Sequence, residues 1–157
     1  MVTAASQEES KPCAYCTIPE IKERSIIEND LVWAFPTNIP ITEGHTLISP
    51  KRCVKKLSDL SDAERLALLA MADEIQDALR SAYGAEGFNC VWNQETLAGQ
   101  TVPHFHLHII PRKGGDTGLL GYDPRSMLYR TGDREPTDEG ELRKIRDAIR
   151  SVLDTAP

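Results

Sequence analysis

The sequence predicts an α+β domain in which an antiparallel sheet carries helices on one side. Two sets of segments lead to this class. The segments of the first set are short, apolar and bounded by turn-prone residues, which is typical of β-strands. They lie near residues 31–36, 45–50, 87–93 and 104–111. The second set has apolar residues at helical spacing, over residues 61–83 and 138–153. Short connections between strands favour antiparallel pairing, because parallel strands need long crossovers.

Length and composition indicate one soluble globular domain. The chain has 157 residues, of which 40% are hydrophobic and 27% charged, and its net charge is −6. An acidic chain is a poor general binder of nucleic acid, although it can still hold a small anion through local donors. No apolar run is long enough for a membrane span, so we expect neither nucleic acid nor membrane as a partner.

The first eleven residues are polar and lack the apolar core of a signal peptide. We therefore expect a disordered tail over residues 1–11, a single domain over residues 12–157 and a cytoplasmic location. In a reducing cytoplasm, Cys13-Ala14-Tyr15-Cys16 indicates metal or redox chemistry rather than a structural disulfide. The pair alone leaves three alternatives open, which are half of a zinc site, a redox pair, or no function.

The first two strands are expected on either side of a proline-containing connection. Residues 31–35 form a strongly apolar run after the turn-prone residues 28–30. A second strand is expected over residues 44–50, and its His45 is the only histidine outside the segment discussed below. Cys53 follows the end of this strand, where its thiol could face the Cys13 and Cys16 pair.

The long helix begins with a capping box, in which Ser61 is followed three residues later by Glu64, and it ends at Gly84. We assign its apolar stripe to the core, and this stripe comprises Leu66, Leu69, Ala70, Ala72, Ile75 and Leu79. In the strand that follows, Cys90 is interpreted as a small buried apolar residue. Residues 117–136 are rich in Gly and Pro and predict an irregular arm before the C-terminal helix.

Three of the four histidines lie in one strand-like segment, where His104, His106 and His108 alternate with apolar residues. On a strand they would share one face, with neighbours about 7 Å and the outer pair about 13 Å apart, while Phe105, Leu107 and Ile109 face the core. One metal ion could bind an adjacent pair but hardly all three. The row therefore favours divided roles, with one imidazole as nucleophile and another as proton donor, over a metal-binding strand or plain surface histidines.

Two stretches resemble the histidine triad (HIT) family, namely GHTLISPKR at 44–52 and GQTVPHFHLHII at 99–110. The resemblance runs from about residue 13 to residue 116. It implies a HIT-like fold, with an antiparallel sheet of about five strands, one long helix and a C-terminal helix. Members of the family commonly form two-fold dimers, so a homodimer is expected here.

The resemblance also implies roles for individual residues. His106 would attack the α-phosphate of a nucleotide, giving a nucleotidyl-histidine that water hydrolyses without a catalytic metal. His108 would donate to the phosphoryl oxygens, which suits its protonated form, and His104 completes the triad. The resemblance assigns contacts with phosphate or leaving group to Asn93, Gln100 and Thr101, and an orienting or ligand-contacting role to His45. At the family's ribose-contacting position stands Thr37, with Asn38 beside it.

The resemblance to the HIT family also implies a structural zinc site. Some bacterial relatives hold zinc through an N-terminal Cys-X-X-Cys, a residue after the Pro-Lys-Arg segment and the first triad histidine. The matching residues here are Cys13, Cys16, Cys53 and His104. Three thiolates and one imidazole form an accepted tetrahedral set for structural zinc.

Three functions follow as hypotheses. The first is a hydrolase of diadenosine polyphosphates like the Fhit branch of the family, favoured by the residues around the triad. The second is a Hint-like phosphoramidase acting on nucleoside phosphoramidates, and the presence of Asn93 favours this hypothesis. The third is a nucleotide-binding scaffold module, although binding alone would not need an intact triad.

Overall fold

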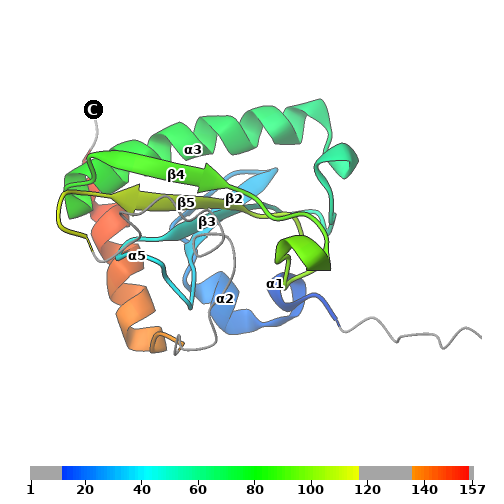
Figure 1. The fold of residues 1–157 in the computed structure, drawn as a ribbon, viewed down its shortest axis with the longest axis horizontal. Helices are drawn as coiled ribbons and strands as arrows, with labels where there is room; N and C mark the ends of the chain where they lie inside the picture. Colours follow the sequence, from blue (N-terminus) through cyan, green and yellow to red (C-terminus); the bar gives the residue numbers. More distant parts are fainter. Residues whose placement is uncertain (1–11, 117–135, 156–157) are drawn as a thin grey trace, which may run out of the picture.

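A computed structural model describes residues 12–116 and 136–155 (Figure 1). The tail predicted over residues 1–11 and the arm predicted over 117–136, apart from Pro136, lie outside the described residues. The helices are α1 (Ala14–Thr17), α2 (Pro19–Glu23), α3 (Asp62–Tyr83) and α5 (Glu139–Leu153), with 3-10 turns at Leu57–Asp59 and Thr96–Ala98. The strands are β1 (Ile27–Glu28), β2 (Val32–Pro36), β3 (Thr46–Pro50), β4 (Gly87–Val91) and β5 (Leu107–Arg112).

The strands form one antiparallel sheet in the order β1-β2-β3-β5-β4. This confirms the predicted α+β class and the sheet of about five strands. The central pair of β3 and β5 sets Leu47 opposite His108 and Ile48 opposite Leu107. Because side chains alternate across a sheet, His108 and Leu47 lie on one face, and Leu107 and Ile48 lie on the other.

Helix α3 covers one face of the sheet and forms the main core with it. It begins as predicted, since Ser61 Oγ accepts a hydrogen bond from Glu64 N, and it ends at Gly84 in the left-handed conformation. The expected core stripe was wrong in its first turns, where Leu66 and Leu69 are 69% and 63% exposed and Ala70 is also exposed. The side chains that face the sheet are instead Leu68, Met71, Ala72, Ile75, Ala78 and Leu79.

Helices lie on both faces of the sheet, not on one side as the sequence predicted (Figure 1). The short helices α1 and α2 were not expected, and they pack a second apolar cluster against the face away from α3. Helix α5 packs against α3 and β2. Its Arg146 and Arg150 donate to the carbonyls of Glu23 and Ile26, which ties α5 to the chain between α2 and β1.

Three smaller expectations near the sheet were also wrong. Strand β5 begins at Leu107, so His104 and His106 lie in the segment that precedes it, and β4 ends at Val91 rather than at residue 93. Cys90 is exposed, because β4 is an edge strand of the sheet. Among the described residues, no helix combines the length and apolarity needed to cross a membrane.

Candidate functional site

A cavity of about 300 Å³ lies on the sheet face away from α3. The strands contribute Phe35, Leu47, Val91, His108 and Ile110 to its wall, while α1 and α2 contribute Tyr15 and Ile21. The predicted site residues that line it are His45, Asn93, Thr101, His106 and His108, together with Thr37 and Asn38. His104 and Gln100 are not among the lining residues.

The protonation of His108 follows from a short chain of hydrogen bonds. The backbone N–H of Ile41 donates to Nδ1 of His45 at 3.1 Å, so this nitrogen carries no proton. His45 must then carry its proton on Nε2, which lies 2.9 Å from Nδ1 of His108 and donates to it. His108 is therefore left with its own proton on Nε2 and can donate from the neutral form, so it need not be an imidazolium.

His106 is fixed in the complementary tautomer. Its Nδ1 lies 2.8 Å from the carbonyl oxygen of His104, and because a carbonyl can only accept, Nδ1 carries the proton. The Nε2 atom of His106 therefore keeps its lone pair. The rings of His106 and His108 are 4.9 Å apart at their centroids. The site thus brings one imidazole that is unprotonated at Nε2 next to one that carries its proton on Nε2.

Gln100 turns away from this arrangement. Its side-chain oxygen accepts from Glu95 N at 2.9 Å, and its side-chain nitrogen donates to the carbonyl of Lys55 at 3.0 Å. These bonds hold the loop before the triad, where Glu95 has a φ of 71° and Gly99 a φ of 89°. In this structure Gln100 shapes the loop that presents Thr101 to the cavity.

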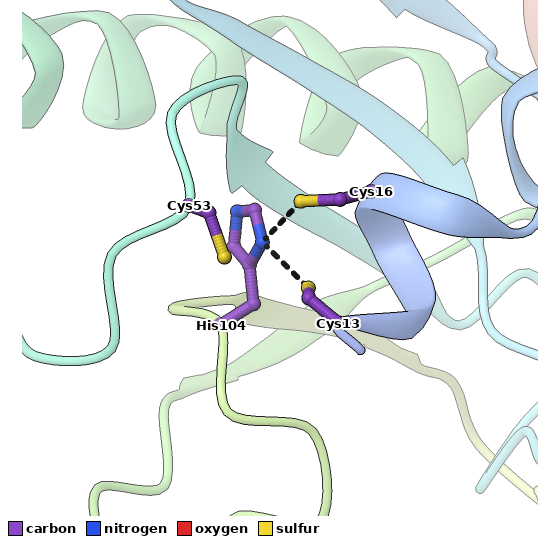
Figure 2. Close-up of side chains that lie close together, drawn as sticks. All are labelled: Cys13, Cys16, Cys53 and His104. Carbon is purple, nitrogen blue, oxygen red and sulfur yellow. Dashed lines mark hydrogen bonds between the residues drawn. The ribbon is translucent and has the colours of Figure 1, made fainter. Parts of the chain in front are cut away.

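The triad's first histidine belongs to a cluster of possible metal ligands. Cys13, Cys16, Cys53 and His104 each offer one ligand atom, and these atoms all lie within 4.8 Å of one another (Figure 2). His104 is 1% exposed and donates from Nε2 to the carbonyl of Pro50 at 2.8 Å, which leaves the lone pair on Nδ1. That atom lies 3.2 Å from the sulfur of Cys13 and 3.7 Å from the sulfur of Cys16.

The cluster fits a tetrahedral zinc ion. Bonds of about 2.3 Å to sulfur and 2.0 Å to nitrogen place neighbouring ligand atoms about 3.6 Å apart, close to the separations observed. Burial and the neighbouring thiols of Cys13 and Cys53 raise the pKa of Cys16 to about 12, so the Cys16 thiol stays protonated unless a bound cation stabilises its thiolate. The donor set therefore matches a structural metal.

A buried carboxylate holds the loop that carries Cys53. The side chain of Arg52 binds Glu64 at 3.0 and 2.7 Å and also donates to the carbonyl of Asp59. The Arg52 guanidinium lowers the pKa of Glu64 to about 2. Since Glu64 lies in the first turn of α3, this pair anchors the Cys53 loop to the start of the helix.

Two side chains in the cavity wall were missed by sequence reasoning. Tyr15 lies in α1 between Cys13 and Cys16, and its ring centroid is 5.5 Å from those of both His104 and His106. Arg24 follows α2, is only 4% exposed and lines the cavity. Tyr15 could have been noticed from its place inside the Cys-X-X-Cys motif. Arg24 could not, because nothing in the charged run around it marks it as buried.

Comparison with known proteins agrees with this geometry. Residues 18–115 match the family model described as the HIT domain. The chain is 40% identical over 134 residues to "Bis(5'-nucleosyl)-tetraphosphatase [asymmetrical]" of Schizosaccharomyces pombe, covering 79% of this chain and 74% of that protein. It is 44% identical over 79 residues to the "Nitrilase and fragile histidine triad fusion protein NitFhit" of Caenorhabditis elegans, covering 50% of this chain but only 18% of the fusion protein.

Among solved structures, the fold is similar to that of a Zn-bound histidine triad family protein from Mycobacterium smegmatis. The TM-score is 0.70 at 27% identity, covering 91% of this chain and 94% of that one. Fold and site together define an enzyme of the nucleotidyl hydrolase and transferase class. The chain belongs to the histidine triad, or HIT, family.

Proposed function

We propose that this protein hydrolyses dinucleoside polyphosphates at an α-phosphate through a nucleotidyl intermediate on His106, with diadenosine polyphosphates as substrates. The observation that carries the proposal is the hydrogen bond from His106 Nδ1 to the carbonyl of His104, which leaves Nε2 as a nucleophile in the cavity wall. The name of the S. pombe relative supports this substrate class.

The reaction has two steps. The Nε2 lone pair of His106 attacks the α-phosphorus, and the bond from that phosphorus to the bridging oxygen breaks. The remaining polyphosphate leaves with the bonding electrons, and the N–H of His108 stabilises the charge that develops on the phosphoryl oxygens. Water then attacks the same phosphorus, the P–N bond breaks with its electrons returning to Nε2, and a proton of the water is released.

Other residues of the cavity support binding rather than bond breaking. The Thr101 hydroxyl and the Asn93 amide, both in the wall, are donors suited to phosphate or the leaving group. Thr37 and Asn38 line the cavity at the end of β2, where a hydroxyl and an amide can bind ribose hydroxyls. His45 acts through His108, whose tautomer it fixes.

Asn93 lines the cavity wall and supports a second candidate function. This candidate is a phosphoramidase, which releases an amine from a nucleoside phosphoramidate. Initial rates with diadenosine tetraphosphate and with an adenosine phosphoramidate separate the two. The proposal expects faster turnover of the first substrate. Faster turnover of the second would favour the phosphoramidase, and nucleotide binding without turnover of either would favour a scaffold module.

We also propose that Cys13, Cys16, Cys53 and His104 hold a structural zinc ion. The ion would join α1, the loop after β3 and the segment before β5, and it would take no part in the reaction itself. A reducing cytoplasmic setting would keep the thiols available to the metal. Elemental analysis of the purified protein should find about one zinc per chain, and less than about a tenth of an equivalent would contradict the site.

A further inference from the structure

A buried arginine in the cavity wall has no role in the reaction described above. Arg24 follows α2 and is 4% exposed, and arginine is almost never buried to this extent unless it is paired. Its Nη1 donates to Glu139 Oε1 at 3.0 Å. Among residues 12–116 and 136–155, its Nε has no hydrogen-bond partner.

The partner of Arg24 comes from outside the part of the chain that matches the HIT family. Glu139 is the first residue of α5, whereas the family match ends at residue 115. The backbone N–H of Thr137, just before this helix, donates to the carbonyl of Asn38, which lines the cavity. The C-terminal helix is therefore tied to the cavity wall at two points and holds the Arg24 side chain in place.

The position of Arg24 separates it from the reacting phosphate. The cavity is lined by His108 on β5, by Phe35 on β2 and by Arg24, which stands three residues before β1, the edge strand next to β2. Neighbouring strands are about 4.8 Å apart, so β2 lies about 10 Å from β5 across the sheet. Arg24 therefore stands on the β1 side of the cavity, which the apolar side chains of Ile18 and Ile21 also line. This is the side on which a nucleoside would lie if its phosphate were at His106.

The charges of Arg24 and Glu139 also disfavour the binding of a second phosphate beside Arg24. Glu139 neutralises the charge of Arg24, so the pair as a whole does not attract an anion strongly. A guanidinium carries five N–H groups, and Glu139 accepts one of them. Unused N–H groups beside apolar side chains are suited to a neutral, flat ligand that has hydrogen-bond acceptors on its edge.

We propose that Arg24, oriented by Glu139, donates hydrogen bonds to the edge of the nucleotide base and sets the base preference of this site. The inference rests on the proposed function, because it requires a nucleotide in the cavity. Guanine offers adjacent acceptors at O6 and N7, whereas adenine offers N7 beside an amino group that is itself a donor. The planar fork of arginine matches the guanine edge, so among dinucleoside polyphosphates Arg24 contributes more to the binding of a guanine base than to that of an adenine base.

Binding of mononucleotides tests the inference without depending on turnover. Isothermal titration of GMP and AMP into the wild type and into Arg24→Met gives the ratio of their dissociation constants in each protein. We expect Arg24→Met to weaken GMP binding more than AMP binding, by about tenfold in the ratio. An equal effect on both nucleotides, or none, would overturn the inference and leave the proposed hydrolase intact.

Arg150→Met is the matched control for damage to α5. Arg150 also ties the helix to the main domain, through the carbonyl of Ile26 at 2.7 Å, but it does not line the cavity. The ratio of GMP to AMP binding should stay within about twofold of wild type in this variant. A change as large as that in Arg24→Met would show that helix docking, not base contact, sets the preference, and would contradict the inference.

A second variant covers the case in which Arg24→Met does not fold. Arg24→Lys keeps the positive charge opposite Glu139 but lacks the planar fork, so it should show the same fall in the ratio. A wild-type ratio in Arg24→Lys would overturn the inference. If the folded wild type binds neither GMP nor AMP, the proposed function fails first and the inference fails with it.

Discussion

At the scale of single residues, two hydrogen bonds give neighbouring histidines opposite roles. The carbonyl of His104 holds the proton of His106 on Nδ1, and His45 directs the proton of His108 to Nε2. Neither role requires a charged imidazole. The pair can therefore act as nucleophile and hydrogen-bond donor from the neutral form of each ring.

Replacing His106 by alanine should abolish turnover and leave binding largely intact. The variant lacks the only nucleophile in the proposed reaction, so kcat should fall by about a thousandfold or more, while mononucleotide affinity changes by less than about tenfold. Steady-state rates and calorimetry check the two parts. Near-native rates in His106→Ala would contradict the nucleophile assignment.

The pKa of Glu64 predicts a loss of stability in acid. In the folded protein this pKa is about 2, well below the ordinary value of 4.5, because Arg52 stabilises the carboxylate. The stabilisation is complete above about pH 4.5 and declines as the pH falls toward about 2. Urea unfolding at several pH values should show this decline in the wild type.

The Glu64→Gln variant is the control for that titration, since the amide has no charge to lose. The difference in free energy of unfolding between wild type and Glu64→Gln should shrink as the pH falls below about 4.5. A difference that stays constant down to about pH 2 would show that the Arg52–Glu64 pair does not depend on the carboxylate charge.

Sequence reasoning succeeded for residues whose position follows from a motif and failed for those placed by tertiary contacts. His106 and His108, on either side of Leu107, both line the cavity, although only His108 lies within β5 and His104 does not line the cavity. The orientation of Gln100 depends on Glu95 and the carbonyl of Lys55, and the burial of Arg24 depends on Glu139, far away in the chain. Local patterns carry no information about such partners.

At the scale of elements, the residues of the proposed zinc site come from three segments, which are the start of α1, the loop after β3 and the segment before β5. Helix α1 has four residues, which is too short to be stable alone. It follows its N-cap Cys13 and contains Cys16 and Tyr15, of which Tyr15 lines the cavity. We therefore expect the metal to hold α1, and with it the aromatic ring that contacts His106, in place.

Cys53→Ser should lower both zinc content and thermal stability. Loss of one thiolate weakens a four-ligand site, and the Tm should fall by about 5 °C or more because metal binding stabilises only the folded chain. Cys90→Ser is the matched control, since Cys90 is exposed and lies outside the cluster. Equal zinc content in both variants, at the wild-type level, would exclude Cys53 as a ligand.

Element boundaries were predictable where a local signal marks them. The capping box at Ser61 and the left-handed Gly84 fixed the ends of α3. The side that α3 buries was harder to predict, because Leu66 and Leu69 follow a helical stripe yet face away from the sheet. Helices α1 and α2 were missed because they are short and are stabilised by packing against the sheet rather than by their own sequences.

At the scale of the whole molecule, a strand edge and several exposed apolar side chains are suited to association with a second copy. Strand β4 is an edge of the sheet. Exposed apolar side chains occur on α3, at Leu66 and Leu69, and directly after β4, at Trp92. We propose that a homodimer buries this surface, since an open strand edge and exposed leucines both favour pairing.

Leu69→Glu should convert such a dimer to a monomer, because it places a charge in the apolar contact. Sedimentation velocity should give about 35 kDa for the wild type, twice the 17.5 kDa chain, and the monomer mass for the variant. Glu74→Gln, also exposed on α3 but not apolar, should remain dimeric. A monomeric wild type at micromolar concentration would refute the proposed dimer.

The central claim is that each turnover forms a covalent bond between a nucleotide and Nε2 of His106. Rapid acid-free quenching during turnover of diadenosine tetraphosphate, followed by peptide mass spectrometry, tests it most directly. We predict a transient adenylyl adduct on the peptide containing His106, which disappears as substrate is consumed and is absent from His106→Ala. An adduct on another residue, or rapid turnover without any adduct, would contradict the account.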